Sequence, residues 1–252
     1  MNGKRPYKLP EPLLCSADKE INMTLIDEYI RKHEERMPRY RYLENLYKGF
    51  HDVFRLPEKE SWKPDNRLAV NFPRYITETF LGYAYGIPVK KSHPDEKIKD
   101  AILEFDRDND ISDQEYELAK KCCIYGHAFE YFYQDEEAKT KTVVCNPKEL
   151  FVVYDDTVKS RALFAVRYGK KDDNVTRYGE ILTRTEIIPF DGEKMQESIP
   201  NPYGRINCVE YVLNDERIGL YEEVAGMVET YNRVIGEKAN DVDSFAEAYL
   251  AV

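Results

Sequence analysis

The sequence has no long hydrophobic run. None of its 252 residues lies in a segment that approaches the roughly 18 consecutive apolar residues a membrane helix needs. The first residues, from Met1 to Pro12, contain no apolar core of a secretory signal, so we expect neither a membrane span nor export. Basic residues are also fewer than acidic ones: the chain has 37 Lys and Arg and 47 Asp and Glu, which gives a net charge of −10. This balance argues against a protein that reads nucleic-acid sequence, but it does not exclude one that merely surrounds DNA.

Signatures of catalysis are missing as well. The sequence contains no glycine-rich phosphate loop, no nucleophile elbow and no zinc-protease helix. The sequence has five cysteines and no signal peptide. An odd number of cysteines in such a sequence indicates reduced thiols in a cytoplasmic setting. Tryptophan occurs once, whereas there are 20 tyrosines and 11 phenylalanines. Aromatic weight of this kind is common on surfaces that partner proteins bury.

One acidic segment offers a metal-binding alternative. Asp106, Asp108 and Asp110 with Glu117 have the ligand spacing of a calcium-binding loop. Ile111, however, stands where that loop needs a glycine for its sharp turn. The spacing of Ser112 and Glu115 is that of a capping box, so a helix is expected to start there. The simpler interpretation of the preceding acidic residues is a solvated loop without calcium.

A thiol-rich segment offers a second version of that alternative, a metal-binding or enzymatic cytoplasmic protein. Cys122, Cys123 and His127 are close in the chain, and the i, i+4 spacing of Cys123 and His127 suits zinc. No second pair of cysteines or histidines supplies the remaining ligands. The simpler interpretation is buried thiols beside a turn at Gly126.

The order of the predicted elements favours an α+β fold. Apolar periodicity predicts a helix over 22–47 that Pro38 breaks or kinks, a second that Asn71 caps and Gly86 ends, and others over 96–106 and from Ser112. After Gly126 the chain changes to runs rich in β-branched and aromatic residues. These strand-like runs cover 128–133, 142–145, 150–154, 163–168, 175–185 and 208–212. Helices first and strands second predict a helical N-terminal part and a mixed or antiparallel sheet, then a long C-terminal helix.

That C-terminal helix is expected from Gly219 to Tyr249. At 1.5 Å per residue, its 31 residues would be about 46 Å long. Residues 219–252 carry seven acidic residues against two basic ones, a net charge of −5. The pattern fits a solvated surface helix, a coiled-coil arm or the lining of a channel. Since the chain stops on an apolar run at Val252, we also expect it to be a fragment or truncated.

Several phrases resemble, in order, the portal proteins of long-tailed bacteriophages that infect Gram-positive hosts. The resemblance covers roughly residues 40–252 and includes a Gly-Ile-Pro-Val turn and a Val-Tyr-Asp-Asp-Thr turn. Asn207 departs from the family pattern, which has proline there. The matching segments are Asn66–Ile76, Gly82–Lys90, Glu117–Glu130, Asn146–Thr157, Asn201–Tyr211, Tyr221–Asn232 and Asn240–Leu250.

The resemblance implies a structural subunit without an active site, cofactor or metal. Portal subunits form a homo-oligomeric ring, with twelve copies in virions, at one capsid vertex, where double-stranded DNA passes non-specifically. Terminase, head-completion and scaffold proteins are the implied partners, without a membrane. The implied location is the virion, and the host bacterial cytoplasm during assembly, with a gene that a prophage can carry. Family members continue through most of a clip, a second stem helix and a crown, which this chain lacks.

The resemblance also assigns regions and residues. It implies that residues 21–215 are the portal wing domain and 216–252 the stem helix with the start of the clip, while residues 1–20, which prolines punctuate, are expected to be a flexible arm. One face of the stem helix would line the channel and another would pack on neighbouring subunits. The expected channel-lining residues are Glu222, Glu229, Arg233, Glu237, Asp241 and Asp243, and the expected interface residues are Val224, Met227, Tyr231, Ile235, Val242 and Phe245.

Overall fold

The computed structural model shows a mixed α+β protein and describes residues 7–173 and 175–250. The helices are α1 (Met23–Glu34), α2 (Met37–Lys48), α3 (Phe72–Tyr85), α4 (Glu96–Asp108), α5 (Ile111–Tyr125) and α6 (Ala225–Leu250), with a 3₁₀ turn η1 (Asp52–Arg55). The strands are β1 (Leu13–Cys15), β2 (His127–Gln134), β3 (Thr140–Cys145), β4 (Leu150–Asp155), β5 (Ala162–Lys170), β6 (Arg177–Leu182), β7 (Glu186–Asp191), β8 (Lys194–Met195), β9 (Ile199–Pro200) and β10 (Cys208–Val212). The predicted α+β class is confirmed, and α1–α5 precede β2–β10 as expected, but the strand β1 comes before the first helix.

Local signals place most helix ends correctly. Pro38 occupies the first turn of α2 and separates it from α1, as the sequence predicts. The side chain of Asn71 accepts a hydrogen bond of 3.1 Å from the backbone N–H of Arg74 and so caps α3. The capping box predicted at Ser112 does not form, because α5 already begins at Ile111. There Asp110 adopts a left-handed conformation without a capping hydrogen bond from its side chain.

Two sheets build the body of the molecule. The larger one has the strand order β1-β4-β5-β6-β7-β8, with β9 also paired to β7, and the smaller one has the order β10-β2-β3. Only the β1–β4 pair is parallel among the described strands. The arm predicted to be flexible therefore contains an edge strand, since Leu13 and Cys15 are buried against β4. Residues 1–6 of that arm lie outside the described residues.

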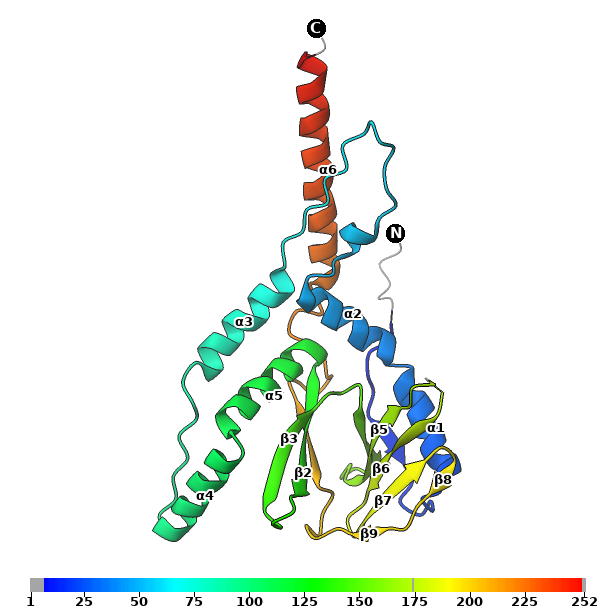
Figure 1. Cartoon of the computed structure of the whole chain (residues 1–252), viewed down its shortest axis with the longest axis vertical. Helices are drawn as coiled ribbons and strands as arrows, with labels where there is room; N and C mark the ends of the chain where they lie inside the picture. Colours follow the sequence, from blue (N-terminus) through cyan, green and yellow to red (C-terminus); the bar gives the residue numbers. More distant parts are fainter. Residues whose placement is uncertain (1–6, 174, 251–252) are drawn as a thin grey trace.

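The large sheet has a core on each face, which explains the continuous apolar run of β4. On one face, Ile26 and Ile30 of α1 pack against Val153 and neighbouring side chains of the sheet. On the other face, Phe129 of the small sheet packs against Leu150. Figure 1 shows the two sheets and α1 together at the base of the molecule. Strands buried on both faces need apolar residues at every position rather than at alternate ones.

His33 lies between α1 and the large sheet and supplies a pH test of the fold. Its Nδ1 is 3.0 Å from the Tyr168 hydroxyl, and its Nε2 is 2.8 Å from the carbonyl oxygen of Pro147. Burial lowers the pKa of His33 from 6.5 to about 3. The unfolded chain therefore takes up a proton near pH 6.5 that the folded chain refuses until about pH 3.

Acid should consequently destabilise the protein through this histidine. As the pH falls below 6.5, His33 should cost up to about 1.4 kcal/mol of unfolding free energy per pH unit. We expect His33→Gln, which keeps a donor for Pro147, to be less sensitive to acid between pH 6 and pH 4. Urea denaturation at several pH values measures the two slopes. Equal slopes would contradict the assignment, because other acid-labile groups are the same in both proteins.

The C-terminal helix rises from the body instead of crossing a sheet (Figure 1). It begins at Ala225, six residues later than the predicted Gly219, and it has 26 residues. Residues 219–224 form turns because the N–H of Leu220 donates to the carbonyl of Cys123 over 2.7 Å and ties this segment to α5. No helix of the described part of the chain is long and apolar enough to cross a bilayer.

Candidate functional site

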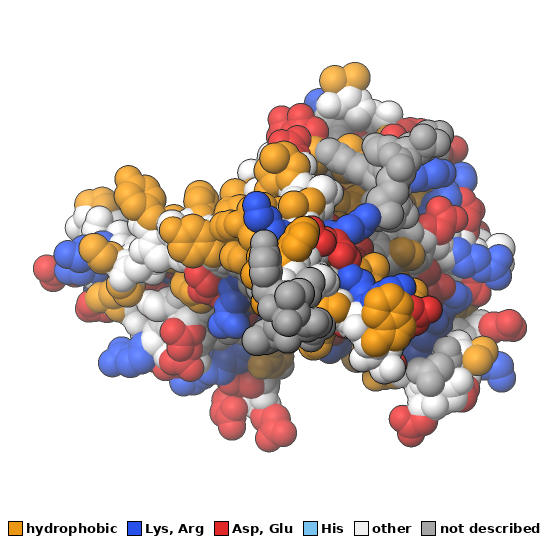
Figure 2. Space-filling view, turned by 90° about the horizontal axis from the view of Figure 1, so that it is seen from above, with side chains coloured by type: hydrophobic (Ala, Val, Ile, Leu, Met, Phe, Trp, Pro, Cys, Tyr) orange, Lys and Arg blue, Asp and Glu red, His pale blue; other side chains and the backbone are white. Residues whose placement is uncertain are grey.

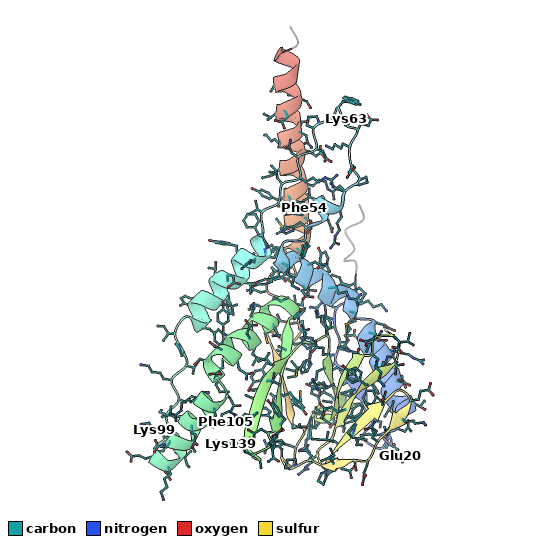
Figure 3. All side chains as sticks on the ribbon, in the orientation of Figure 1. Glu20, Phe54, Lys63, Lys99, Phe105 and Lys139 are labelled. Carbon is teal, nitrogen blue, oxygen red and sulfur yellow. The ribbon has the colours of Figure 1, made fainter. Side chains whose placement is uncertain are left out.

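Helix α6 presents three different faces, which follow from about 100° of rotation per residue. One face is covered by residues 51–70 of the same chain, a segment that we call the strap. A second face is polar and exposed, and a third is apolar and exposed. Figure 3 places Phe54 and Lys63 on the strap beside the helix. The strap, rather than a sheet, is therefore the packing partner of α6 in its own chain.

The strap is held by polar side chains spaced along the buried face of α6. The side-chain oxygen of Asn232 accepts the N–H of Val70 at 2.9 Å, and that of Asn240 accepts the N–H of Asn66 at 2.6 Å. Between them, a Cβ atom on Gly236 would lie 2.8 Å from the carbonyl oxygen of Asn66. Glycine at this position allows the extended backbone to lie directly against the helix.

Three of the predicted channel-lining acids also bind the strap. Glu229 accepts from His51 at 3.1 Å and from the N–H of Asp52 at 3.0 Å. Glu237 forms an ion pair with Lys59 at 2.9 Å. The hydrogen bond from Lys59 is the main reason why the pKa of Glu237 is lowered. Asp243 accepts from the side chain of Asn66 at 2.6 Å. Part of the negative charge of α6 is therefore neutralised or hydrogen-bonded inside its own subunit.

Glu222 cannot line a channel. Both it and Arg39 are fully buried, and the Arg39 Nε donates to Glu222 Oε1 at 2.8 Å. Glu222 precedes α6 and lies in the turns that connect the helix to the body, so the predicted extension of the helix to Gly219 misplaced its side chain. Of the predicted set, Arg233 and Asp241 remain on the exposed polar face.

Five of the six residues predicted for a subunit interface are exposed on the apolar face in the single chain. We call the residues of this face the apolar stripe, and Met227 and Phe245 are 74% and 69% exposed within it. Ile235 lies outside the stripe and is partly buried, whereas Val234 belongs to it. The signal for Val234 was its distance of three residues from Tyr231, which places both on one side of a helix. The stripe consists of Met227, Tyr231, Val234, Val242 and Phe245 on α6, together with Val224 in the turn that precedes the helix.

The apolar surface continues from α6 onto α3. The rings of Tyr231 and Phe72 are 5.6 Å apart, and Tyr75 and Tyr83 on α3 are strongly exposed. Figure 2, which looks down on the molecule, shows hydrophobic side chains gathered from the middle of the view toward the side where α3 and α4 project. Exposed apolar surface of this extent is typical of a protein that binds partners.

The cysteine–histidine cluster has structural roles in place of metal ligation. Burial raises the pKa values of Cys122 and Cys123 to about 12, so both are thiols at neutral pH. His127 Nε2 is 2.8 Å from the Tyr40 hydroxyl, and its Nδ1 is 2.7 Å from Glu210. Within the described residues, no group of three or more His, Cys, Asp and Glu could hold a metal ion. Nothing in the geometry supports the metal-binding alternative.

The acidic segment around Asp106 does not form a calcium loop either. Asp106 and Asp108 lie in the last turn of α4, and Glu117 lies inside α5. Lys91 pairs with Asp106 at 2.9 Å and with Glu115 at 3.1 Å. Lys91 and Glu115 line a largely apolar cleft of about 800 Å³ between α3, α4, α5 and the small sheet. Asp106, Asp108 and Glu117 are thus each paired with a lysine.

Comparisons with known proteins agree with this geometry. A family model described as "Phage portal protein, SPP1 Gp6-like" matches residues 26–252. The portal protein of Bacillus phage SPP1 is 21% identical to this chain, over 97% of the chain and 54% of that protein. The chain thus spans about half the length of this curated relative. Because the family model covers most of the sequence, the chain belongs to the SPP1-like family of phage portal proteins.

Proposed function

We propose that this chain is a structural portal subunit in which residues 21–215 form the wing and α6 is the stem helix. The observation that carries the proposal is the position of α6, which stands clear of the sheets with its apolar stripe uncovered (Figure 1). A single subunit gains nothing from exposing such a stripe to water. Burial between neighbouring copies would recover about 1.5–3 kcal/mol for each large side chain.

A ring explains why the apolar stripe and the strap occupy different faces of α6. Head-to-tail rings use heterologous interfaces, in which two different surfaces of each copy meet. We propose that the apolar stripe of one copy packs on the stem region of the next. Val224, Met227, Tyr231, Val242 and Phe245 remain interface residues in this proposal, and Val234 replaces Ile235.

The polar face of α6 is then the face that meets DNA in the channel. Each contact between a phosphate and Lys or Arg adds affinity through counterion release, and such affinity slows a polymer that must move. Asp241 supplies exposed negative charge on this face, next to Arg233, whereas the exposed carboxylate of Glu237 is paired with Lys59 of the strap. Double-stranded DNA would therefore pass without specific binding. Glu222 is buried and Glu229 is covered by the strap, so neither contributes to this face.

The remaining roles follow from family membership. We propose that the chain acts without catalysis and without a cofactor, at the portal vertex of a virion, after assembly in the host cytoplasm. Terminase, head-completion and scaffold proteins would be its partners. The SPP1 relative is about twice as long, so regions equivalent to its remaining half would complete these contacts.

Native mass measurement of the full chain tests the proposal. We expect an assembly of about twelve times the 29.6 kDa chain mass, because a closed ring satisfies every copy of the apolar stripe. Electron microscopy of the same sample should show rings with a central opening. A protein that stays monomeric at micromolar concentration would contradict the proposal for this chain.

A further inference from the structure

The segment that connects β10 to α6 is tied to the body at several points. The N–H of Leu213 donates to the carbonyl of Gly126 at 2.9 Å, and Leu220 donates to Cys123. Within the segment, the side chain of Asn214 bonds both the N–H and the carbonyl of Ile218, at 2.7 and 2.8 Å. We call residues 213–222 the joint, because they link the wing to α6.

Close contacts leave the joint no room to shift toward α5. Gly126 has a φ of +86°, and a Cβ atom there would lie 1.9 Å from the carbonyl oxygen of Arg217. A Cβ atom on Gly219 would lie 2.5 Å from the carbonyl oxygen of Ile124. The joint therefore packs backbone against backbone on the turn that ends α5.

Arg39 of α2 connects three parts of the joint through one planar group. Its Nε donates to Glu222 Oε1 at 2.8 Å, and its Nη2 donates to the carbonyl of Arg217 at 2.8 Å and also to Glu222 Oε2. Glu222 Oε2 in turn accepts the N–H of Gly219 at 2.8 Å. The side chains of Arg39 and Glu222 are only 1% and 0% exposed. Such a buried, bidentate pair restricts the relative orientation of its partners.

A second buried group fixes the other side of the joint. Arg217 donates to both carboxylate oxygens of Glu210 on β10, at 2.8 and 2.9 Å. His127 on β2 and the hydroxyl of Tyr154 on β4 also contact Glu210. The joint is therefore bonded to α2, to the end of α5 and, through Glu210, to both sheets before α6 begins.

We propose that Arg39 is a positioning residue that sets the direction in which α6 leaves the body. Direction matters because α6 is about 39 Å long, so a tilt of about 10° at its base moves its tip by about 7 Å. Such a displacement would separate stem helices that must touch. The benefit to ring assembly rests on the proposed function, whereas the control of direction does not.

Distances between spin labels test the proposal in the full chain. Labels at Lys238→Cys on α6 and Lys159→Cys on the β4–β5 turn report the direction of α6, because both positions are exposed. The five native cysteines are buried, and the chain without added cysteines gives the background. Dilution with unlabelled chain removes distances between copies. We expect one narrow distance distribution for native Arg39, a distinctly broader or shifted one for Arg39→Met, and an intermediate one for Arg39→Lys.

The controls separate positioning from stability. Val166→Ala lowers stability in the core of the large sheet without touching the joint, and it should leave the distribution unchanged. A folded Arg39→Met protein with the native distribution, or equal broadening by Val166→Ala, would overturn the proposal. If Arg39→Met does not fold, Glu222→Gln is measured in its place, because it keeps the shape of the side chain but removes its charge. A native distance distribution in Glu222→Gln would overturn the proposal as well. A monomeric mass with an altered Arg39→Met distribution would contradict the ring but not the joint.

Discussion

Replacing Val234 and Phe245 by aspartate is expected to convert the assembly into monomers without unfolding the subunit. Both side chains are more than half exposed in the single chain, so the body loses no packing when they change. In the ring, each interface would lose about 1.5–3 kcal/mol of apolar burial per site. Each interface would also have to desolvate two carboxylates, which costs several kcal/mol more. Sedimentation velocity measures the assembly, and far-UV circular dichroism measures the helix content.

The matched control places the same two charges on the polar face of α6. Thr230→Asp with Ser244→Asp adds two carboxylates at exposed positions outside the apolar stripe. We expect this protein to assemble like the native chain. If the Val234 and Phe245 variant keeps the native mass, or if the control dissociates to the same extent, the apolar stripe is not the interface.

Removing the carboxylate of Glu222 is expected to be the most damaging single change to stability. Glu222→Ala leaves the buried guanidinium of Arg39 without its charged partner, and breaking a buried ion pair in this way costs about 3–5 kcal/mol. The N–H of Gly219 loses its acceptor at the same time. Urea denaturation gives the free energy of unfolding. The neighbouring Glu223 is exposed, so Glu223→Ala should stay within about 0.5 kcal/mol of the native chain.

A small effect at Glu222 would be informative. A loss of less than about 1 kcal/mol would place the pair in a solvated environment, since exposed ion pairs contribute about that much or less. In that case Glu222 would be an exposed acid like the others of the C-terminal segment. The Arg39–Glu222 pair could then not hold the joint rigid.

The sequence was a good guide wherever a local signal decides the structure. Pro38 and Asn71 mark helix starts through backbone chemistry that involves only neighbouring residues. The β-branched and aromatic runs of β2 and β4 likewise predict strands. β7 was missed as a separate strand, and the sequence offered little signal for it because Pro189 interrupts its apolar run. The short β8 and β9 have two residues each and depend on pairing with β7.

Apart from the choice of Ile235 over Val234, the errors at the candidate site come from contacts between distant parts of the chain. Helical periodicity continues back to Gly219, but contacts with Cys123 and Arg39 hold those residues in turns. Counting charge along α6 could not reveal that the strap, about 180 residues earlier in the chain, binds Glu229 and Glu237. One available signal was overlooked. Asn232, Gly236 and Asn240 recur every four residues and form a small, polar face suited to an extended backbone.

The resemblance to portal proteins contributed what the physical pattern could not. The pattern alone left α6 as a surface helix, a coiled-coil arm or a channel lining. The family match extends over the C-terminal helix, and the proposal of a channel lining rests on that membership. The exposed apolar stripe is consistent with packing against other subunits, because large exposed apolar side chains such as Met227 and Phe245 are typical of interaction surfaces.

A three-dimensional reconstruction of the assembled chain tests the central claim most directly. The account predicts that α6 stands next to the symmetry axis, with Met227, Val234 and Phe245 between neighbouring copies and Asp241 turned toward the opening. The strap should remain on the α6 of its own subunit through Asn232 and Asn240. A ring in which α6 lies at the outer rim, or in which the apolar stripe faces solvent, would contradict the account.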